Sequence, residues 1–486
     1  MIRRRSNSIV LGAAAVICAL AAQWLLHRVN VAVPFPPYSA GNWLIRHTPG
    51  SIATRSIDSL GKEAKPALAA TVAIGLLVVG AAIGHRRWTP AFVALATISA
   101  ALLDPIDTGF GAVALAASAG ALAAVLPFAV NALSPRSAGV RSGRREFLGL
   151  VAGSALLVAI SASRVGWGSS RPRSAFQSDR LQPFVRRIDP SFKEVEGLSA
   201  AITSPADHYV VDINFEPPIV DDETWALAID ATGTAATRLS LQEILTLAAT
   251  EQPVFLECVS NYVGGPLASN GLWSCIPLAD VLGMSGRSAN GHRTILAHAF
   301  DGYSAAIPSE HVDEVVLAFA MSGETIPRRH GFPVRLLWPG RYGMLSVKWL
   351  TRLELIDEPA DGFWAARGWD RDGLLKTGSR IDTPERAAHV SVPLTIAGVA
   401  WGQRGISRVE VSTDDEASWQ EAQVEEAISE LSWRRWQTSI DVPEGKVQLA
   451  VRAFDGDGEL QPTGSQPPHP SGASGIHHVE AVREGG

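Results

Sequence analysis

Apolar residues gather in five runs within the first third of the chain, and polar and apolar residues alternate over the rest. The runs are Ile9–Leu26, Pro66–Ile83, Ala91–Leu103, Gly111–Val130 and Phe147–Ala162. A bilayer-spanning helix needs about 20 mostly apolar residues, or about 17 at the short end. The third run is shorter and turns at residues 104–107 directly into the fourth. Because the runs lack the polar face of a soluble helical bundle, they predict an all-α transmembrane domain of about five helices over residues 1–165.

Clusters of arginine predict how this domain is oriented. They lie at Arg3–Arg5, at Arg86-Arg87 and between Arg136 and Arg145. Five spans place all three clusters in the cytoplasm, and everything after about Ser163 then lies on the extracytoplasmic side of a multi-pass cell-membrane protein. The pair Arg144-Arg145, directly before the fifth run, resembles a twin-arginine export signal. The alternative is a simple topogenic anchor.

Charge and cysteine content exclude two classes of protein. Residues through Ser163 carry 14 Lys and Arg against 5 Asp and Glu, whereas the remainder carries 28 against 43, for a net charge of −6. A nucleic-acid partner is not expected, because such a protein gathers basic charge on a folded face. With only three cysteines in 486 residues, the chain is not a disulfide scaffold.

The polar two-thirds of the chain divides by pattern into two further domains after a linker at 166–200. Residues 201–379 read as mixed α+β, with strands at Trp225–Asp230 and Val254–Cys258 and a helix at Leu239–Ala249 that begins with a possible Ser240/Glu243 capping box. Residues 380–486 read as an all-β, immunoglobulin-like sandwich, with strands at Val390–Ile396, Ile406–Ser412 and Lys446–Ala453. We therefore expect a multi-domain protein.

Cys258 ends one of these strands and opens a glycine-containing loop, a place where side chains project into a cleft. Zinc needs several thiolate or imidazole ligands at suitable spacing, and the sequence offers no CxxC or HxxxH. A single thiolate suits a soft metal whose other ligands come from a cofactor. Two alternatives stay open: an inert buried cysteine, and the nucleophile of a cysteine-dependent hydrolase.

A second group of chemically active residues follows about 70 residues later. His330, Arg335 and Lys348 lie along segments rich in glycine and proline, which include Gly343. Backbone N–H groups at such glycines, together with Arg and Lys, can hold a phosphate-bearing ligand. The alternative is a solvated basic face, although interleaved apolar residues such as Phe332 and Trp338 argue against it.

At these residues the sequence resembles the sulfite oxidase family of molybdopterin enzymes. The resemblance covers about residues 205–482 in a dozen short motifs. They include His208–Pro218, Glu257–Asn261 with Gly264-Gly265, Asp301-Gly302-Tyr303, His330–Arg335, Pro339–Gly343, Lys348-Trp349, Ser379–Pro384, Val409–Ser412 and Arg452–Asp455. The last two match the family's C-terminal dimerisation domain, so the resemblance implies a homodimer.

The resemblance also implies a molybdenum–molybdopterin cofactor with Cys258 as the protein's ligand to molybdenum. By the same resemblance we assign Cys258, Asn261 and Tyr262 to catalysis, and seven residues to cofactor binding: Tyr209, Ser260, Asn261, His330, Arg335, Gly343 and Lys348. The expected activity is two-electron oxygen-atom transfer on a small sulfur-containing or other oxo substrate. Cys275 and Cys18 are read as structural and inert.

Three departures from the family pattern bear on substrate and partner. Tyr262, Val263 and Val211 stand where enzymes that bind sulfite carry arginine. A doubly charged anion needs such partners, so a neutral oxo compound such as a sulfoxide fits better. No cytochrome b5-like segment is visible, which implies a separate electron-transfer partner, a cytochrome or a quinone. The alternative function is a non-catalytic, membrane-anchored binding protein on the same scaffold.

Overall fold

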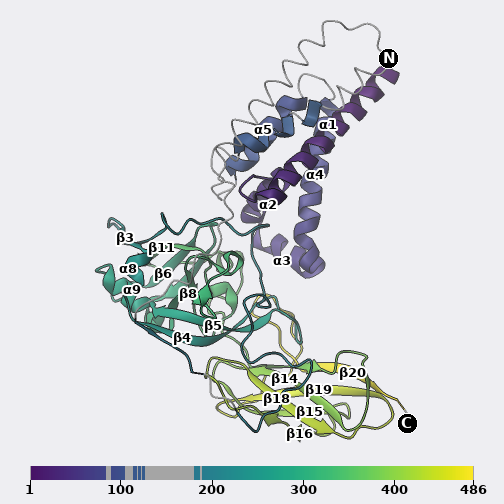
Figure 1. Ribbon diagram of the computed structural model, residues 1–486, viewed down its shortest axis with the longest axis vertical. Helices are drawn as coiled ribbons and strands as arrows, with labels where there is room; N and C mark the ends of the chain where they lie inside the picture. The colour runs from purple at the N-terminus through teal and green to yellow at the C-terminus, as the bar shows by residue number, and fades with distance from the viewer. Residues whose placement is uncertain are drawn as a thin grey trace. The chain divides into compact units, whose positions relative to one another are not determined.

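The computed structural model describes residues 2–83, 89–103, most of 113–125, 180–185 and 189–484. The chain divides into two compact units (Figure 1). Unit 1 comprises Met1–Arg171 together with Asp212–Ile219, and unit 2 comprises Pro172–Val211 together with Val220–Gly486. The domain boundaries predicted from sequence at 165, 200 and 379 stay predictions.

The described part of unit 1 is helical. Its elements are α1 (Ile2–Val29), α2 (Pro36–His47), α3 (Gly50–Leu60), the 3-10 turn η1 (Gly61–Glu63), α4 (Ala64–Ile83) and α5 (Thr89–Leu103). Small side chains let the helices approach closely: Ala15, Val16 and Ala19 of α1 share a buried cluster with Val93 of α5. The interior also holds polar groups, since the Gln23 amide donates to the Thr97 hydroxyl at 2.7 Å.

The expectation of five membrane-spanning helices is wrong for the described residues, which contain two helices long and apolar enough to cross a bilayer. These are Ile9–Val29 and the continuous helical stretch Gly50–Ile83. The third predicted run forms a helix of only 15 residues. Of the fourth, the stretch Val113–Val125 is likewise too short. The fifth run and the paired arginines before it lie outside the described residues. Length is the physical reason for the correction, because about 20 residues are needed to span the hydrocarbon core.

Unit 1 also binds a short segment that comes much later in the sequence, Asp212–Ile219. The ring of Phe215 stacks on Tyr38 with a centroid distance of 4.7 Å and an interplanar angle of 13°. Gly41 makes room for the same ring, because a Cβ there would lie 2.6 Å from it. Asn42 and Arg46 of α2 hydrogen bond to the backbone N–H of Phe215 and the side chain of Asn214. The segment is therefore fixed by both aromatic and polar contacts.

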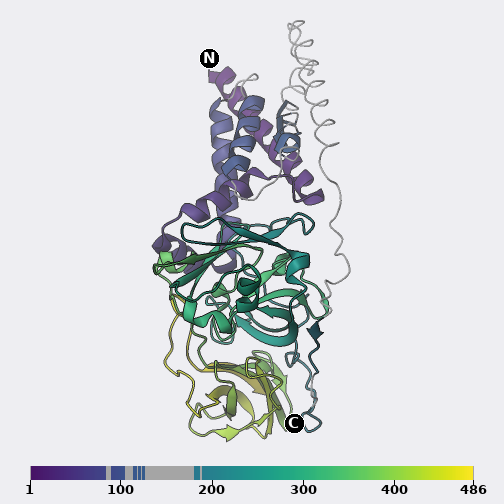
Figure 2. The ribbon, with the colours of Figure 1, turned by 90° about the vertical axis from the view of Figure 1, so that its left-hand side faces the viewer.

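Two mixed sheets form the first part of unit 2 (Figure 2). One has the order β1-β4-β5-β8-β10, with β9 paired to β8, and comprises Leu181–Gln182, Ala249–Glu257, Ala268–Pro277, Val316–Met321, Arg335–Leu337 and Glu324–Thr325. The other has the order β3-β2-β11-β6-β7 and comprises Thr237–Ser240, Ala226–Ala231, Leu350–Ile356, Thr294–Ala299 and Ser304–Pro308. Two short helices, α8 (Leu241–Ile244) and α9 (Leu278–Met284), connect strands.

The second part of unit 2 is a β-sandwich, as predicted. One sheet has the order β12-β14-β18-β17 and comprises Gly378–Thr383, Leu394–Trp401, Arg434–Ile440 and Gln423–Val424. The facing sheet has the order β13-β20-β19-β15-β16 and comprises His389–Val390, His477–Arg483, Gly445–Asp455, Ile406–Ser412 and Gln420–Glu421. Both contribute to one apolar core, in which Ile396 and Trp436 of the first sheet join Val409 and Leu449 of the second.

One local prediction was wrong in extent. The helix expected over Leu239–Ala249 is reduced to α8, because residues 237–240 pair with β2 as a strand and β4 begins at Ala249. The predicted capping box at its start is confirmed. The Ser240 hydroxyl accepts from the Glu243 N–H, and the Glu243 carboxylate accepts from the Ser240 N–H.

Candidate cofactor and metal site

Cys258 follows the last residue of β4, a central strand of its sheet, and its side chain is buried with 8% exposure. A tight turn follows, because the Asn261 N–H donates to the Cys258 carbonyl at 2.9 Å. Burial raises the pKa of the Cys258 thiol, and the adjacent Ser260 acts in the opposite direction. The loop thus presents one buried sulfur atom at the end of a strand.

The Asn261 side chain has a structural task within this loop. Its amide nitrogen donates to the Glu257 carboxylate at 2.9 Å, and its oxygen accepts from the Leu267 N–H at 3.0 Å. The second Glu257 oxygen accepts from the indole N–H of Trp401 in β14, at 3.0 Å. Burial raises the pKa of Glu257 to about 7, although both hydrogen bonds lower it. The Cys258 loop is therefore closed by Asn261 and fastened to the sandwich by Trp401.

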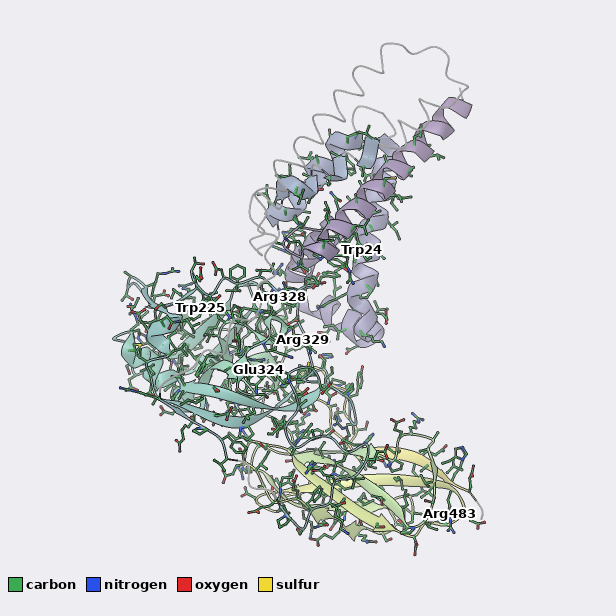
Figure 3. All side chains as sticks on the ribbon, in the orientation of Figure 1. Trp24, Trp225, Glu324, Arg328, Arg329 and Arg483 are labelled. Carbon is green, nitrogen blue, oxygen red and sulfur yellow. The ribbon has the colours of Figure 1, made fainter. Side chains whose placement is uncertain are left out.

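His330, Arg335 and Lys348 come together around one turn, η3 (Arg328–His330), which Gly331 ends with φ +113°. A Cβ at Gly331 would lie 3.0 Å from the Cβ atoms of both Arg335 and Lys348, so glycine lets these two cations converge. Arg335 donates to the His330 carbonyl at 2.9 Å. The Lys348 ammonium donates to the carbonyls of Val211 and Arg329, both at 3.2 Å. Figure 3 labels the adjacent Arg328 and Arg329.

Tyr209 and Gly343 connect this cationic group to the thiol. A Cβ at Gly343 would lie 2.5 Å from the Tyr209 hydroxyl oxygen and 3.5 Å from the carbonyl oxygen of Glu257, the residue before the thiol. Burial raises the pKa of Tyr209 well above its usual range, and the neighbouring Cys258 contributes. Only glycine fits at position 343 while the phenol keeps this position.

The electrostatics around the two buried histidines are one-sided. Burial lowers the pKa of His208 to about 3, and Arg335, His330 and Lys348 lower it further. Burial likewise lowers the pKa of His330 to about 4, with Arg335, Lys348 and Arg329 acting in the same direction. No carboxylate contributes to either shift. This wall of the site therefore has a positive potential that suits an anionic group such as a phosphate.

The donor set fits a metal that brings its own ligands. Among the described residues no three His, Cys, Asp or Glu side chains lie close enough to hold a metal ion. The site contains one buried thiol and a group of basic side chains next to glycine residues. A molybdenum–molybdopterin group fits these residues, because the pterin dithiolene supplies sulfur ligands to the metal and the pterin phosphate needs cationic partners.

Tyr262 does not share this environment. Its side chain is 58% exposed, in contrast to the buried Cys258 and Asn261. Its assignment to catalysis stays a prediction.

Sequence reasoning gave no role to five residues that the structure brings to the site. They are His208, Glu257, Tyr303, Trp401 and His469. The ring of His208 lies 5.2 Å from that of His330. Tyr303 donates to the Met344 carbonyl at 2.5 Å, and burial raises its pKa, with Asp301 and Cys258 contributing. The only sequence signal for these residues was their position in or beside the family motifs, and Trp401 and His469 are too distant in the chain for spacing to reveal them.

A pocket of about 360 Å³ lies beside the site. Its lining includes Tyr303, Met344, Leu345, Trp364, Asp361 and Arg371. Neither Cys258 nor any of His330, Arg335 and Lys348 lines it. The pocket therefore adjoins the site through Tyr303 and the segment after Gly343. Its volume alone does not make it the substrate-binding pocket.

Two family models match unit 2 in succession. Residues 214–364 match the oxidoreductase molybdopterin binding domain, and residues 375–467 match the Mo-co oxidoreductase dimerisation domain. The first match contains every assigned site residue except Tyr209. It indicates a molybdopterin cofactor for this domain.

The curated proteins to which the chain is similar include sulfite oxidases. The chain is 30% identical over 341 residues to the mitochondrial sulfite oxidase of Mus musculus. That alignment covers 59% of this chain and 61% of the mouse protein. The chain is 27% identical over 329 residues to the sulfite oxidase of Arabidopsis thaliana, and this alignment covers 54% of the chain and 84% of the plant protein. The chain thus spans about three-fifths of the length of the mouse protein.

A solved structure has the same fold. The crystal structure of the sulfane dehydrogenase SoxCD from Paracoccus pantotrophus superposes with a TM-score of 0.51 at 23% identity, covering 61% of this chain and 90% of that one. At this identity the likeness establishes the fold alone. From the two matched domains, these relatives and the thiol-and-cation site, the chain belongs to the sulfite oxidase family of molybdopterin-dependent oxidoreductases.

Proposed function

We propose that the protein is a molybdopterin-dependent oxidoreductase that carries out two-electron oxygen-atom transfer on a small oxo substrate. One observation carries the proposal: the Cys258 thiol is buried at the end of a central strand, next to a wall formed by His330, Arg335 and Lys348. A hydrolase that used Cys258 would need a histidine as its base. Of the histidines beside this loop, His469 bonds to Ser260 and His477 lies against Gly264.

Five of the assigned residues have a defined task in this proposal. Cys258 supplies the thiolate, while Arg335 and Lys348 neutralise the pterin phosphate. Tyr209 and Gly343 shape the space between them. When bound, the cofactor supplies the two-electron oxygen-transfer chemistry. The chain contributes orientation, exclusion of water and a fixed positive charge.

Metal analysis tests the ligand assignment. The full-length protein, produced with a supply of cofactor, should contain about one molybdenum per chain, and Cys258→Ser should retain less than about a tenth of that amount. Cys18→Ser is the matched control and should retain all of it. Molybdenum content unaffected by Cys258→Ser would refute the assignment.

The surroundings of the loop support a neutral substrate. Tyr262 and Val211 stand where enzymes that bind sulfite carry arginine, and their side chains are 58% and 43% exposed. Neither the phenol nor the isopropyl group carries a positive charge for an incoming anion. A sulfite dianion would lose hydration without gaining a partner. We therefore infer a sulfoxide or a similar neutral oxo compound as substrate. A dye-linked assay should give a higher kcat/KM for sulfoxides or N-oxides than for sulfite, and a clear preference for sulfite would overturn this inference.

The helices of unit 1 support membrane anchoring. In the span that contains α4, only 6% of the most apolar window is buried inside the structure, and Ile74 and Val78 are exposed. A helix that is this apolar and this uncovered needs a lipid environment. Together with the arginine clusters, this favours an anchor with unit 2 outside the cytoplasm. Protease treatment of spheroplasts should digest unit 2, and its complete protection would contradict that orientation.

Assembly and electron transfer follow from the same domains. The match to the dimerisation domain supports a homodimer, which light scattering of the detergent-solubilised protein should reveal as twice the chain mass. Two-electron chemistry at the metal requires electrons to enter or leave the site, and we infer a separate electron carrier, a cytochrome or a membrane quinone.

A further inference from the structure

The Cys258 loop ends in a tight turn over residues 262–265. The Gly265 N–H donates to the Tyr262 carbonyl at 2.8 Å, and Gly264, the third residue of the turn, has φ +75°. A Cβ on Gly264 would lie 2.1 Å from the His477 ring, so only glycine fits there. The turn begins with Tyr262, one of the positions where enzymes that bind sulfite carry arginine.

Arg380, in the first strand of the sandwich, binds the last residue of this turn. Its Nη1 atom donates to the Gly265 carbonyl at 2.9 Å. Its Nη2 atom donates to the Ser199 hydroxyl at 3.0 Å, and its Nε atom donates to the Asp382 carboxylate at 2.6 Å. The second Asp382 oxygen accepts from the Ser199 N–H at 3.0 Å. One guanidinium thus connects the Cys258 loop to the sandwich and to the segment around Ser199.

Burial and charge define what this guanidinium can do. The side chain of Arg380 is 11% exposed and that of Asp382 is 7% exposed. Each of the three guanidinium nitrogens has an acceptor, and charge-assisted bonds of this kind fix the orientation of the group. Asp382 also neutralises its charge at contact distance. Arg380 therefore does not replace the arginines that sulfite-binding enzymes carry in this turn, and what it supplies is a fixed donor.

We propose that Arg380 is a positioning residue for the substrate, which holds the turn at 262–265 and with it the Tyr262 side chain. This proposal rests on the proposed function, in which Tyr262 belongs to the catalytic site. Because the Tyr262 side chain is 58% exposed, its position depends on the backbone of the turn more than on packing. Without the bond from Arg380 to Gly265, the turn has to be ordered each time substrate binds, and this ordering weakens binding.

Hydrogen–deuterium exchange of the full-length protein measures the turn directly. Arg380→Gln shortens the side chain and removes the donor to Gly265. The peptide that covers residues 259–267 should exchange about tenfold faster in this variant, because the bond that closes the turn opens more often. Ser199→Ala is the matched control, since it removes only the acceptor of Nη2, and exchange should stay as in the wild type. Unchanged exchange in Arg380→Gln would overturn the proposal.

A second variant keeps the test valid where the single variant fails to fold. Arg380→Gln leaves the buried Asp382 carboxylate without its cation, which is destabilising in itself. The double variant Arg380→Gln/Asp382→Asn has no charge at either position and still lacks the donor to Gly265. It should show the same faster exchange in the turn, and exchange equal to the wild type would contradict the proposal.

Steady-state kinetics with dimethyl sulfoxide and a reduced dye test the role in substrate binding. In Arg380→Gln the KM should rise about tenfold, while kcat and molybdenum content stay within about twofold of the wild type, because the turn must be ordered in the ground state and the transition state alike. If the wild type prefers sulfite, the same rise is expected with sulfite and an oxidised dye. Arg452→Gln breaks the 2.6 Å ion pair with Glu410 in the same sandwich and should change neither constant.

The two proposals fail in different ways. Absence of molybdenum from the wild-type protein would refute the proposed function, and with it the role of Arg380 at the substrate. Molybdenum present in the wild type, together with an unchanged KM in Arg380→Gln, would overturn the role of Arg380 alone. A loss of molybdenum from Arg380→Gln and from the double variant would also overturn it, because Arg380 would then serve cofactor retention.

Discussion

The two halves of the site are built in different ways. The cationic half is built within the first part of unit 2. Arg335 bonds to a carbonyl 5 residues away and Lys348 to one 19 residues away, and Lys348 and His330 also bond to the carbonyls of Val211 and Pro205. The thiol half also depends on the sandwich, since Trp401 lies 144 residues from Glu257 and His469 lies 209 residues from Ser260. The geometry of the thiol depends on the completed fold of unit 2.

The largest expected effect tests the cationic half. Gly331→Ala introduces a Cβ at φ +113° and 3.0 Å from two neighbouring Cβ atoms, so it should lower the free energy of unfolding of unit 2 by about 3 kcal/mol. Gly323→Ala is the control, because φ there is +74° but nothing lies within 4 Å of the added atom. Denaturant unfolding followed by tryptophan fluorescence measures both. Equal losses would mean that backbone strain alone matters and that Gly331 does not serve the convergence of Arg335 and Lys348.

The next prediction tests the attachment of the thiol half to the sandwich. Trp401→Phe keeps the contact with Phe255 but removes the indole N–H from the buried Glu257 carboxylate, which should cost about 2 kcal/mol. Trp433→Phe removes a comparable bond to a neutral carbonyl, that of Ala201, and should cost about 1 kcal/mol. The same unfolding experiment compares them. A smaller loss for Trp401→Phe than for Trp433→Phe would show that the carboxylate does not need this donor.

A smaller effect should appear in the pH dependence of unfolding. Burial lowers the pKa of His477 to about 4, with Arg380 and His478 acting in the same direction and Asp382 opposing them. Between its unfolded pKa of about 6.5 and this value, the unfolded chain binds a proton that the folded chain does not, so stability falls as pH falls. From pH 7.5 to 5.5 the contribution is about 1 kcal/mol. His477→Asn should remove that part of the loss, and an unchanged pH dependence would contradict the assignment.

The smallest expected change in stability accompanies a large change in cofactor retention. Lys348 is half-buried, and its ammonium bonds to two carbonyl oxygens and lies 5.0 Å from the centroid of the Trp349 ring. A methionine can keep the contact with the ring, so Lys348→Met should alter the free energy of unfolding by less than about 0.5 kcal/mol. Pterin retained after gel filtration should nevertheless fall about tenfold, because a charge-assisted bond to phosphate is lost. Lys446→Met, at an exposed ion pair with Glu480, is the control. Unchanged pterin content would remove Lys348 from the phosphate site.

This contrast also explains what could be predicted from the sequence. The residues of the cationic group were recognisable because glycine, proline and basic side chains alternate within one short stretch. A pattern of neighbouring residues can be read directly from the sequence. The strand before Cys258 and the β-sandwich followed from alternation in the same way. Trp401 and His469 gave no comparable signal, since an indole or imidazole becomes part of the site only when the two domains of unit 2 pack together.

The helices show a second limit of pattern reading. Apolar composition identified the runs in unit 1, and the third ends at Leu103 as expected, in a helix of 15 residues that is too short to span a bilayer. The helix expected at 239–249 was shortened, because strands lie on both sides of α8. There tertiary context overrode the local preference of the residues.

The long reach of the bonds around Cys258 has a consequence for biosynthesis. A ribosome that has just released Cys258 from its tunnel has yet to add the Trp401 indole and the His469 imidazole, which follow Glu257 by 144 residues and Ser260 by 209 residues. The Cys258 loop of a nascent chain therefore lacks two of its supports until the sandwich domain has been made. We expect cofactor insertion to wait for that domain.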